Sequence, residues 1–242
     1  MLKHTPRPGG GQTASRGETR PSNPAREGYY WRMSETTADA ILGLVSGRRG
    51  HFRLESGYHG DLWLDLDCLF ARPGRLAPLV ARLTEILRPY EIAGVCGPLV
   101  GGAFLAQSVA PSLEVEFSYT ERTPSPASGG LYQARYRLPA AFSSRVQGKR
   151  IAIVDDVMSA GSAARATYAE LRAHGAHPVV VGALLFLGSA GVDFFEREGL
   201  AIEPVARLPY SLWSPPECPL CAAGVLLQSP GELDAGADSP TR

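Results

Sequence analysis

The sequence predicts an α/β protein whose central sheet is mostly parallel and is flanked by helices. From about residue 75 to residue 205, apolar segments with the length of buried strands alternate with segments of helical periodicity. Two of the apolar segments, 92–96 and 151–154, each lead into a turn of small residues that opens a helix. This alternation is typical of parallel sheets, because a crossover must return the chain to the same edge.

The expected elements begin with a small N-terminal hood at about 33–70. It should hold a capped amphipathic helix within 34–45 and two short half-exposed strands, 52–54 and 62–66, joined by a turn at 56–60. The larger layer follows. Its expected elements are helices at 75–87, 103–109, 163–174 and 191–198, and strands at 92–96, 115–119, 151–154, 178–187 and 202–205.

Composition sets the limits of the folded part. Of 242 residues, 44% are hydrophobic and 20% are charged, which suffices for one sizeable core. Residues 1–32 are rich in Pro, Gly, Ser, Thr and Arg, so we expect a disordered leader, with an Arg-rich transit peptide as the alternative. We expect the folded domain to span 33–228 and a disordered polar tail to span 229–242.

Charge and cysteine content narrow the classes of partner. The formal net charge is zero, so no overall basic field recruits nucleic acid or an anionic membrane. No apolar run reaches the ~20 residues of a membrane-spanning helix, and four cysteines do not make a disulfide scaffold in a chain of this length. We expect a cytoplasmic protein that binds small molecules or a second copy of itself, with no nucleic-acid or membrane partner.

The turn at 159–163 is the expected binding site for a phosphate group. The first N–H groups of a helix lack intrahelical partners and lie at the positive end of the helix dipole, so they attract an anion. Glycine permits close approach of the backbone, and serine hydroxyls add donors. The expected phosphate-binding residues are Ser159, Ala160, Gly161, Ser162 and Ala163.

Asp155 and Asp156 follow the apolar strand 151–154 directly. Two adjacent carboxylates repel one another, so their presence indicates a ligand. They can accept hydrogen bonds from vicinal ribose hydroxyls, or help to hold a metal ion that arrives with the substrate. The alternative is an ordinary strand-to-helix connection in which Asp caps a turn and Ser caps the helix.

A second tight strand-to-helix loop, 97–103, follows the strand 92–96. Two such loops at one edge of a parallel sheet outline a cleft. Its glycines permit close approach to a diphosphate, although Gly-Pro and Gly-Gly also mark plain turns. The expected pyrophosphate-binding residues are Gly97, Pro98, Gly101 and Gly102.

The run 151–163 resembles the phosphoribosyl pyrophosphate (PRPP) motif of type I phosphoribosyltransferases, and the loop 97–102 resembles the pyrophosphate loop of that family. The resemblance implies the fold of that family, with Asp155 and Asp156 as catalytic residues on the ribose. It also implies that Mg²⁺ arrives with PRPP. Because such transfers pass through an oxocarbenium-like state, the protein positions groups and stabilises charge, and no covalent catalyst is expected.

Three features are similar to the orotate branch of that family: the segment 52–57, the segment 218–225, and Arg165 at the place of the orotate-binding arginine. They imply transfer to orotate, giving orotidine monophosphate and pyrophosphate, by a homodimer with a flexible loop at about 120–136. A guanidinium one turn past the phosphate loop can meet a planar carboxylate in a bidentate fork. A solvated helix arginine is the alternative.

The chain differs from the orotate branch in its cations. Members of the branch carry lysine where this chain has Glu55 and Gly101, and a basic run where 120–130 holds Arg122 as its one basic residue. Each lost donor should cost ~3 kcal/mol of transition-state stabilisation. Arg122 is the cation expected to bind substrate, and Arg135 and Arg137 are further arginines that could compensate for the missing charges. A PRPP- or nucleotide-binding sensor with little or no turnover, and a phosphoribosyltransferase for another base, are therefore the alternatives.

Cys218 and Cys221, within the C-terminal segment 212–228, have the spacing of half a zinc knuckle or of a redox pair. A structural zinc needs four ligands, and the apolar contexts of Cys68 and Cys96 indicate core positions. Surface or turn roles are expected for His51 and His59. We therefore expect no metal site, unless a dimer supplies a second pair of thiolates.

Overall fold

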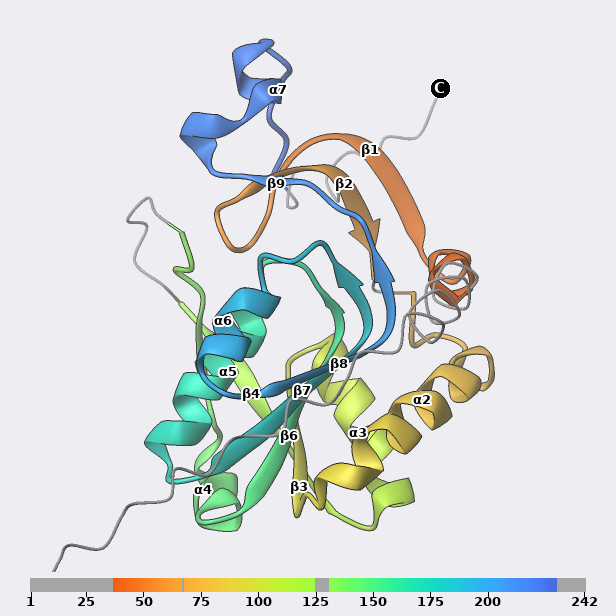
Figure 1. Cartoon of the computed structure of the whole chain (residues 1–242), viewed down its shortest axis with the longest axis vertical. Coiled ribbons are helices and arrows are strands. Elements are labelled where there is room, and N and C mark those ends of the chain that lie inside the picture. The colour runs from red at the N-terminus through yellow and green to blue at the C-terminus, as the bar shows by residue number, and fades with distance from the viewer. Residues whose placement is uncertain (1–36, 67, 125–130, 230–242) are drawn as a thin grey trace, which may run out of the picture.

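The computed structural model of this chain describes residues 37–66, 68–124 and 131–229. The leader expected at 1–32 lies outside these residues, and so does the expected tail apart from residue 229. The described residues form a six-stranded sheet covered by helices and, above its carboxyl edge, a separate three-stranded sheet (Figure 1). Within this part of the chain no helix is both long enough and apolar enough to cross a membrane.

The larger sheet has the strand order β5-β4-β3-β6-β7-β8. Every neighbouring pair is parallel except β4 with β5, so the prediction of a mostly parallel sheet is confirmed. The strands are β3 (Gly94–Pro98), β4 (Glu116–Thr123), β5 (Arg135–Arg137), β6 (Arg150–Met158), β7 (His177–Leu187) and β8 (Ala201–Leu208).

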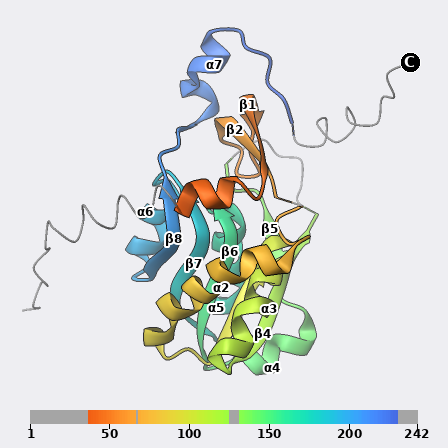
Figure 2. The ribbon, with the colours of Figure 1, turned by 90° about the vertical axis from the view of Figure 1, so that its right-hand side faces the viewer.

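Helices cover both faces of this sheet, as Figures 1 and 2 show. One face carries α2 (Pro73–Leu87) and α3 (Gly101–Leu113), and a short 3₁₀ turn η1 (Arg88–Tyr90) follows α2. The other face carries α4 (Ala140–Val146), α5 (Ser162–Ala173) and α6 (Val192–Arg197). The predicted helices are therefore present, and α4 is an additional one that its short, weakly apolar sequence did not indicate.

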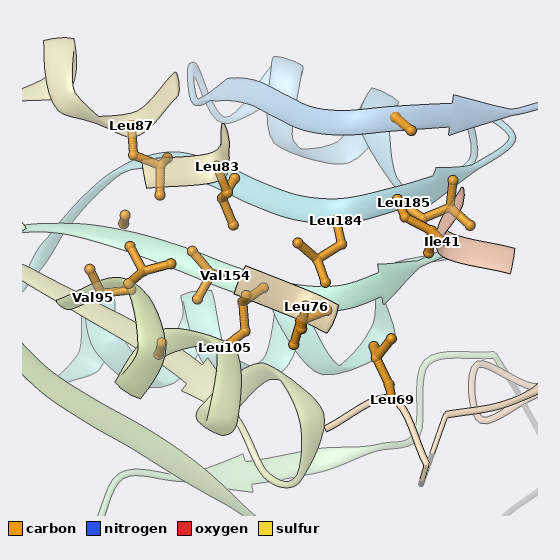
Figure 3. Packing of buried hydrophobic residues seen from close by; sticks show 14 of the residues in the cluster. Ile41, Leu69, Leu76, Leu83, Leu87, Val95, Leu105, Val154, Leu184 and Leu185 are labelled. Atoms are coloured by element: carbon orange, nitrogen blue, oxygen red, sulfur yellow. The ribbon is translucent and has the colours of Figure 1, made fainter. Parts of the chain in front are cut away.

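The alternation of side chains along β6 divides the core in two. Ala152 and Val154 face the α2/α3 side, where they join Leu83 and Leu105. Ile151, Ile153 and Met158 belong to a second cluster on the α5 side. Figure 3 shows the first cluster. Since each fully buried Leu or Val contributes about 1.5–3 kcal/mol, burial on both faces explains why these strands are continuous apolar runs.

The smaller sheet is the hood, with the order β1-β2-β9 and antiparallel pairing. It consists of β1 (Ser46–Arg53), β2 (His59–Asp65) and β9 (Leu212–Trp213), and the chain continues into η2 (Pro215–Glu217) and α7 (Pro219–Ala222). Its third strand comes from the C-terminal part of the chain. The range 33–70 expected for the hood thus supplies two of its three strands, β1 and β2. Residues 37–42 are helical, and their Ala38 and Ile41 pack into the main core.

The flexible loop expected over about 120–136 is shorter than predicted, because strands occupy both of its ends. Residues up to Thr123 belong to β4, and β5 begins at Arg135 and pairs with β4 in antiparallel register. Glu121 lies opposite Arg137 in this ladder, and opposite charges on paired strands favour pairing. Residues 125–130 lie outside the described residues, so the tip of the expected loop stays untested.

Candidate active site

The order of the strands creates a switch point between β3 and β6. From β3 the chain crosses through α3 to β4 on one side, whereas β6 pairs with the other side of β3. In open α/β sheets, ligands bind at the carboxyl ends of the strands at such a point, because the two crossovers diverge there and leave a crevice. The expected pyrophosphate loop and the acidic pair both lie at this edge.

Asp155 and Asp156 lie within β6, which continues to Met158, and not beyond the end of the strand as expected. The register with β3 ends at Ile153, so the two aspartates lie past their β3 neighbours, while Asp155 still pairs with Ala183 of β7. The Asp156 N–H donates to Asp155 Oδ1 over 3.1 Å, and the Val157 N–H donates to Asp156 Oδ1 over 2.7 Å. The strand edge thus fixes both carboxylates.

Both carboxylates are nearly buried, with 8% of Asp155 and 7% of Asp156 exposed. Burial, followed by the charge of Asp156, raises the pKa of the Asp155 carboxyl well above its usual range. Buried carboxylates are costly unless they are paired or coordinate a cation. The two carboxylates are therefore suited to accept hydrogen bonds from hydroxyl groups or to bind a metal ion.

The glycines of the second loop are required by the protein itself. A Cβ on Gly101 would lie 1.9 Å from Asp156 Oδ2, and one on Gly102 would lie 2.9 Å from Asp155 Oδ1. A Cβ on Gly97 would lie 2.0 Å from the Gly102 carbonyl oxygen. Glycine therefore lets the start of α3 pack directly against the acidic pair. This packing explains why glycines are present, and the sequence pattern did not reveal it.

The phosphate turn has the expected backbone. Gly161 is the N-cap of α5 with φ +73°, a left-handed conformation that glycine adopts without strain. No described side chain caps this end of α5, and its first turn holds no acidic residue. Ala160 is buried, so it can offer a ligand only its backbone. The N–H groups at this helix start remain available to an anion.

Glu55, in the β1–β2 turn, reaches this phosphate turn. Ser162 Oγ donates to Glu55 Oε2 over 2.9 Å, and the Tyr136 hydroxyl donates to Glu55 Oε1 over 3.2 Å. Arg122 Nε lies 3.2 Å from the same Oε1. The hydroxyl expected to bind phosphate and the cation expected at the pyrophosphate are thus both bound to one carboxylate.

Arg165, on α5, lies between two aromatic rings. Its Cζ lies 4.0 Å from the ring centroid of Tyr132 and 4.5 Å from that of Phe194. One terminal nitrogen donates to the Ala190 carbonyl over 2.9 Å, while Nε is buried without a partner among the described residues. Desolvation lowers the pKa of this guanidinium. The alternative of a fully solvated helix arginine does not fit this environment.

Sequence reasoning missed Tyr132, Tyr136 and Phe194. Tyr132 also donates its backbone N–H to the Ser56 carbonyl over 2.8 Å, which ties the segment after residue 130 to the hood. These aromatic residues belong to no sequence motif, and only the fold brings them close to the phosphate turn.

The structure places the predicted site residues on three strands, two helices and the turn between β6 and α5. They are Gly97 and Pro98 in β3, Gly101 and Gly102 in α3, Arg122 in β4, Asp155 and Asp156 in β6, Ser159 to Gly161 between β6 and α5, and Ser162, Ala163 and Arg165 in α5.

Comparison with known proteins identifies the family. The family described as phosphoribosyl transferase domain matches residues 76–193. Orotate phosphoribosyltransferase of Thermotoga petrophila is 30% identical over 182 residues, which cover 75% of this chain and 90% of the relative. The chain belongs to the phosphoribosyltransferase family. The orotate phosphoribosyltransferase of Acidithiobacillus ferrooxidans is also 30% identical to this phosphoribosyltransferase, over 203 residues that cover 81% of this chain and 97% of the relative.

Solved structures show the same fold. The orotate phosphoribosyltransferase of Aeropyrum pernix superposes with a TM-score of 0.53 at 22% identity, covering 71% of this chain and 93% of that one. The adenine phosphoribosyltransferase (APRTase) of Giardia lamblia, complexed with 9-deazaadenine, gives 0.57 at 17%, covering 71% and 97%. Type I phosphoribosyltransferases for different bases thus share this architecture, and the protein is an enzyme of the phosphoribosyltransferase type.

The donor set at the acidic pair suits the magnesium ion that phosphoribosyltransferases generally use with PRPP. Mg²⁺ prefers oxygen ligands and is commonly held by one or two carboxylates together with substrate phosphates and water. Asp155 and Asp156 offer carboxylate oxygens at the carboxyl edge of the sheet, beside the phosphate turn. The residues present therefore fit the ion.

Proposed function

We propose that this phosphoribosyltransferase transfers the phosphoribosyl group of PRPP to orotate, giving orotidine monophosphate and pyrophosphate in pyrimidine nucleotide biosynthesis. The observation that carries the choice of acceptor is the environment of Arg165. Its guanidinium lies between two aromatic rings and keeps a buried Nε without a partner among the described residues. A planar aromatic carboxylate can stack against these rings and supplies the acceptor oxygens that the guanidinium lacks.

In this proposal the chain's own residues position PRPP. The amides at 159–163 hold the 5-phosphate, and Asp155 and Asp156 accept hydrogen bonds from the ribose hydroxyls. The bond from the ribose to pyrophosphate breaks as the bond to the base nitrogen forms, so positive charge develops on the ribose and favours nearby carboxylates. Mg²⁺, when bound, neutralises charge on the pyrophosphate, with Asp155 and Asp156 as the residues that would hold it.

Glu55 must release its present partners before this reaction can take place. Its carboxylate accepts from Ser162 and pairs with Arg122, so it holds two groups that PRPP needs. We infer that PRPP displaces Glu55, after which Arg122 is free to approach the pyrophosphate. The cost of this displacement is modest, because the Arg122–Glu55 pair is partly exposed and such pairs contribute about 0–1 kcal/mol.

A PRPP- or nucleotide-binding sensor is the second candidate, and Glu55 is the observation that favours it. A carboxylate beside the phosphate turn repels the anion and gives the leaving pyrophosphate no positive charge. Among the described residues, the one basic side chain paired with Glu55 is Arg122. A phosphoribosyltransferase for another base is the third candidate.

The assembly and location are also proposals. We propose a homodimer, as the resemblance to the orotate branch implies, and a cytoplasmic location, as the composition of the chain favours. Val100 and Phe104, at the start of α3, are large apolar side chains that are 62% and 45% exposed, and a second copy could cover them. Light scattering of the full chain should give twice the monomer mass, and a monomer at the assay concentration would contradict the dimer.

A steady-state assay tests the activity. The full chain is supplied with PRPP, Mg²⁺ and orotate, and orotate absorbance is followed while calorimetry measures PRPP binding. We expect turnover that disappears in the double variant Asp155→Asn/Asp156→Asn. Binding of PRPP without turnover would support the sensor, and turnover with adenine but not orotate would support another base.

Arg165→Lys tests the acceptor separately. Lysine keeps the charge but loses the planar fork that meets a carboxylate in two places. We expect KM for orotate to rise by about 10-fold or more, in line with about 1.5–3 kcal/mol for a charged hydrogen bond. The calorimetric affinity for PRPP should stay unchanged. An unchanged KM for orotate would remove Arg165 from the acceptor site.

A further inference from the structure

Four potential metal ligands meet at the outer end of the hood. His51 lies in β1, His59 in β2, and Cys218 and Cys221 flank the start of α7. One ligand atom from each residue lies within 4.8 Å of the other three. The two histidines are 1% and 3% exposed and Cys218 is 3% exposed, so the expectation of surface or turn roles for the histidines was wrong. The cluster lies apart from the acidic pair, whose residues come from β6.

The distances approach those of a tetrahedral zinc site. Zinc bonds of about 2.0–2.1 Å to nitrogen and about 2.3 Å to sulfur give a tetrahedron with edges of about 3.3–3.8 Å. His51 Nε2 lies 3.1 Å from His59 Nδ1 and 3.3 Å from Cys218 Sγ. Cys221 Sγ lies 3.3 Å from His59 Nδ1 and 3.7 Å from His51 Nε2. Movements of about 1 Å would complete the tetrahedron.

The other nitrogen of His51 orients the ring for this role. His51 Nδ1 lies 2.9 Å from the Val225 carbonyl oxygen, and because a carbonyl only accepts, Nδ1 carries the proton. The neutral ring then presents the lone pair of Nε2 to the cluster. Metal-bound histidines commonly donate their second N–H to a carbonyl or carboxylate in this way.

The two thiols come from a compact loop. The Ala222 N–H donates to the Cys218 carbonyl over 3.1 Å and the Gly224 N–H donates to the Cys221 carbonyl over 3.0 Å. Gly224 has φ +69°, which lets the chain reverse after the second cysteine. Spacing of two residues between cysteines on such a turn is typical of zinc-binding loops, and both cysteines are free thiols in the structure.

Few other interactions hold the C-terminal segment to the hood. The ladder between β2 and β9 has two residue pairs, and an isolated bridge joins Phe52 to Gln228. The helix α7 is four residues long and buries none of its side chains. So little apolar burial gives a short segment little stability of its own, and small elements of this kind are commonly held by a metal ion.

We propose that His51, His59, Cys218 and Cys221 bind one structural zinc ion, which fastens the C-terminal segment to the hood. Two imidazoles and two thiolates in a closed tetrahedral set favour zinc, whereas Mg²⁺ requires oxygen ligands. The site is therefore distinct from that of the substrate-borne Mg²⁺. Because the hood carries Glu55 and Ser56, which contact Ser162 and Tyr132, the zinc also supports the element that covers the active site.

Metal analysis of the full chain, purified under reducing conditions with Zn²⁺ supplied and excess removed, tests this proposal. We expect about one zinc per chain. Replacing it with Co²⁺ should give the visible ligand-field bands and thiolate charge-transfer band of a tetrahedral N₂S₂ site. The cobalt spectrum is measured on the wild-type chain, so it tests the proposal even if the ligand variants fail to fold.

His59→Ala and Cys218→Ser should lose the zinc and the cobalt bands, and should lower the melting temperature. Cys68→Ser is the matched control, because Cys68 is an exposed thiol outside the cluster. It should keep one zinc per chain. Absence of zinc from the reconstituted wild type, or full zinc content in both ligand variants, would overturn the proposal. If the reconstituted wild type binds no zinc, a Cys218–Cys221 disulfide that forms reversibly and is detected by alkylation and mass spectrometry would instead identify a redox pair.

Discussion

Folding and ligand binding favour opposite protonation states of the Asp155 carboxyl. Burial and the neighbouring Asp156 raise the pKa of its carboxyl above the value in the unfolded chain, so the folded state favours the protonated form. Stability therefore falls as pH rises from the unfolded pKa through the folded pKa, and at neutral pH ionisation of this group opposes folding. A ribose or a metal ion that bound the charged carboxylate would offset this loss of stability.

Asp155→Asn should therefore stabilise the ligand-free protein while it abolishes function. The carboxamide keeps the shape but removes the buried charge, and each kcal/mol gained raises the melting temperature by about 2–4 °C in a chain of this size. Turnover should fall by at least about 100-fold. Thermal unfolding at pH 7.5 and again near pH 4 measures the first effect, which should shrink at the lower pH. A lower melting temperature at pH 7.5 would contradict it.

Gly101 determines how closely α3 approaches the acidic pair. In Gly101→Ala the new Cβ would meet Asp156 Oδ2, so either the carboxylate or the start of α3 must move, at about 1–3 kcal/mol. We expect a lower melting temperature and weaker PRPP binding by calorimetry. Gly74→Ala is the matched control on α2, where the added Cβ meets nothing within 4 Å. Equal behaviour of the two variants would show that the contact does not matter.

The same contact affects any attempt to restore the lysine that orotate enzymes carry at this position. A lysine side chain at position 101 would have to displace the Asp156 carboxylate before its ammonium group could bind the pyrophosphate. A lysine at Glu55 meets no such obstacle, because that side chain is partly exposed. Of the two cation-restoring changes, Glu55→Lys is therefore the one expected to increase turnover.

At the scale of elements, the β1–β2 turn controls the start of α5 through Glu55. Removing this charge frees Ser162 and Arg122 for an anion. Glu55→Gln should therefore tighten binding of PRPP by about 3- to 10-fold, the range expected for losing one like charge near a partly exposed site. Calorimetry at two salt concentrations measures it, and the gain should decrease at high salt.

Glu85→Gln is the control for that change, because it removes the same charge from an exposed position on α2. It should leave PRPP affinity unchanged. If Glu55→Gln weakened binding instead, Glu55 would be a residue that positions Arg122 or Ser162 for PRPP rather than one that competes with it.

At the scale of the whole molecule, the site depends on how the hood sits on the larger sheet. Tyr210, between β8 and β9, donates its hydroxyl to the Leu62 carbonyl in β2 over 3.0 Å. Burial, together with the charge of Asp61, raises the pKa of this phenol to about 12, so the donor stays protonated at every physiological pH. The hydroxyl fits there because residue 60 has no side chain.

Gly60→Ala should weaken the contact between the hood and the larger sheet. A Cβ at this position would lie 1.9 Å from the Tyr210 hydroxyl, so we expect a loss of about 1–3 kcal/mol and a clear fall in melting temperature. In the control Gly47→Ala, also in a hood strand, the new Cβ makes an ordinary 3.4 Å contact with Leu64. That variant should unfold at or slightly above the wild-type temperature, since Gly in a strand interior costs about 0.5–1 kcal/mol relative to Ala.

Local signals predicted the larger sheet and the phosphate turn. The apolar run from Ile151 to Val154 predicted a buried strand, and the structure buries both of its faces. The small residues around Gly161 predicted a turn, and the φ of +73° at this glycine is one that glycine adopts without strain. Such features depend on residues within one or two turns of each other. The same local reasoning was wrong for Cys68, whose apolar neighbours indicated the core but which lies exposed in a turn, whereas Cys96 is buried as expected.

Local patterns along the chain were thus enough to predict the alternation of strands and helices and the family, and to nominate candidate residues for a ribose-phosphate site. Three features follow only from how the chain packs: the third hood strand β9, the partners of Glu55, and the meeting of His51 with Cys218, which are 167 residues apart. The physical reason is that periodicity and turn chemistry act between near neighbours in the chain. Contacts between distant segments depend on how whole elements pack, and no local pattern encodes them.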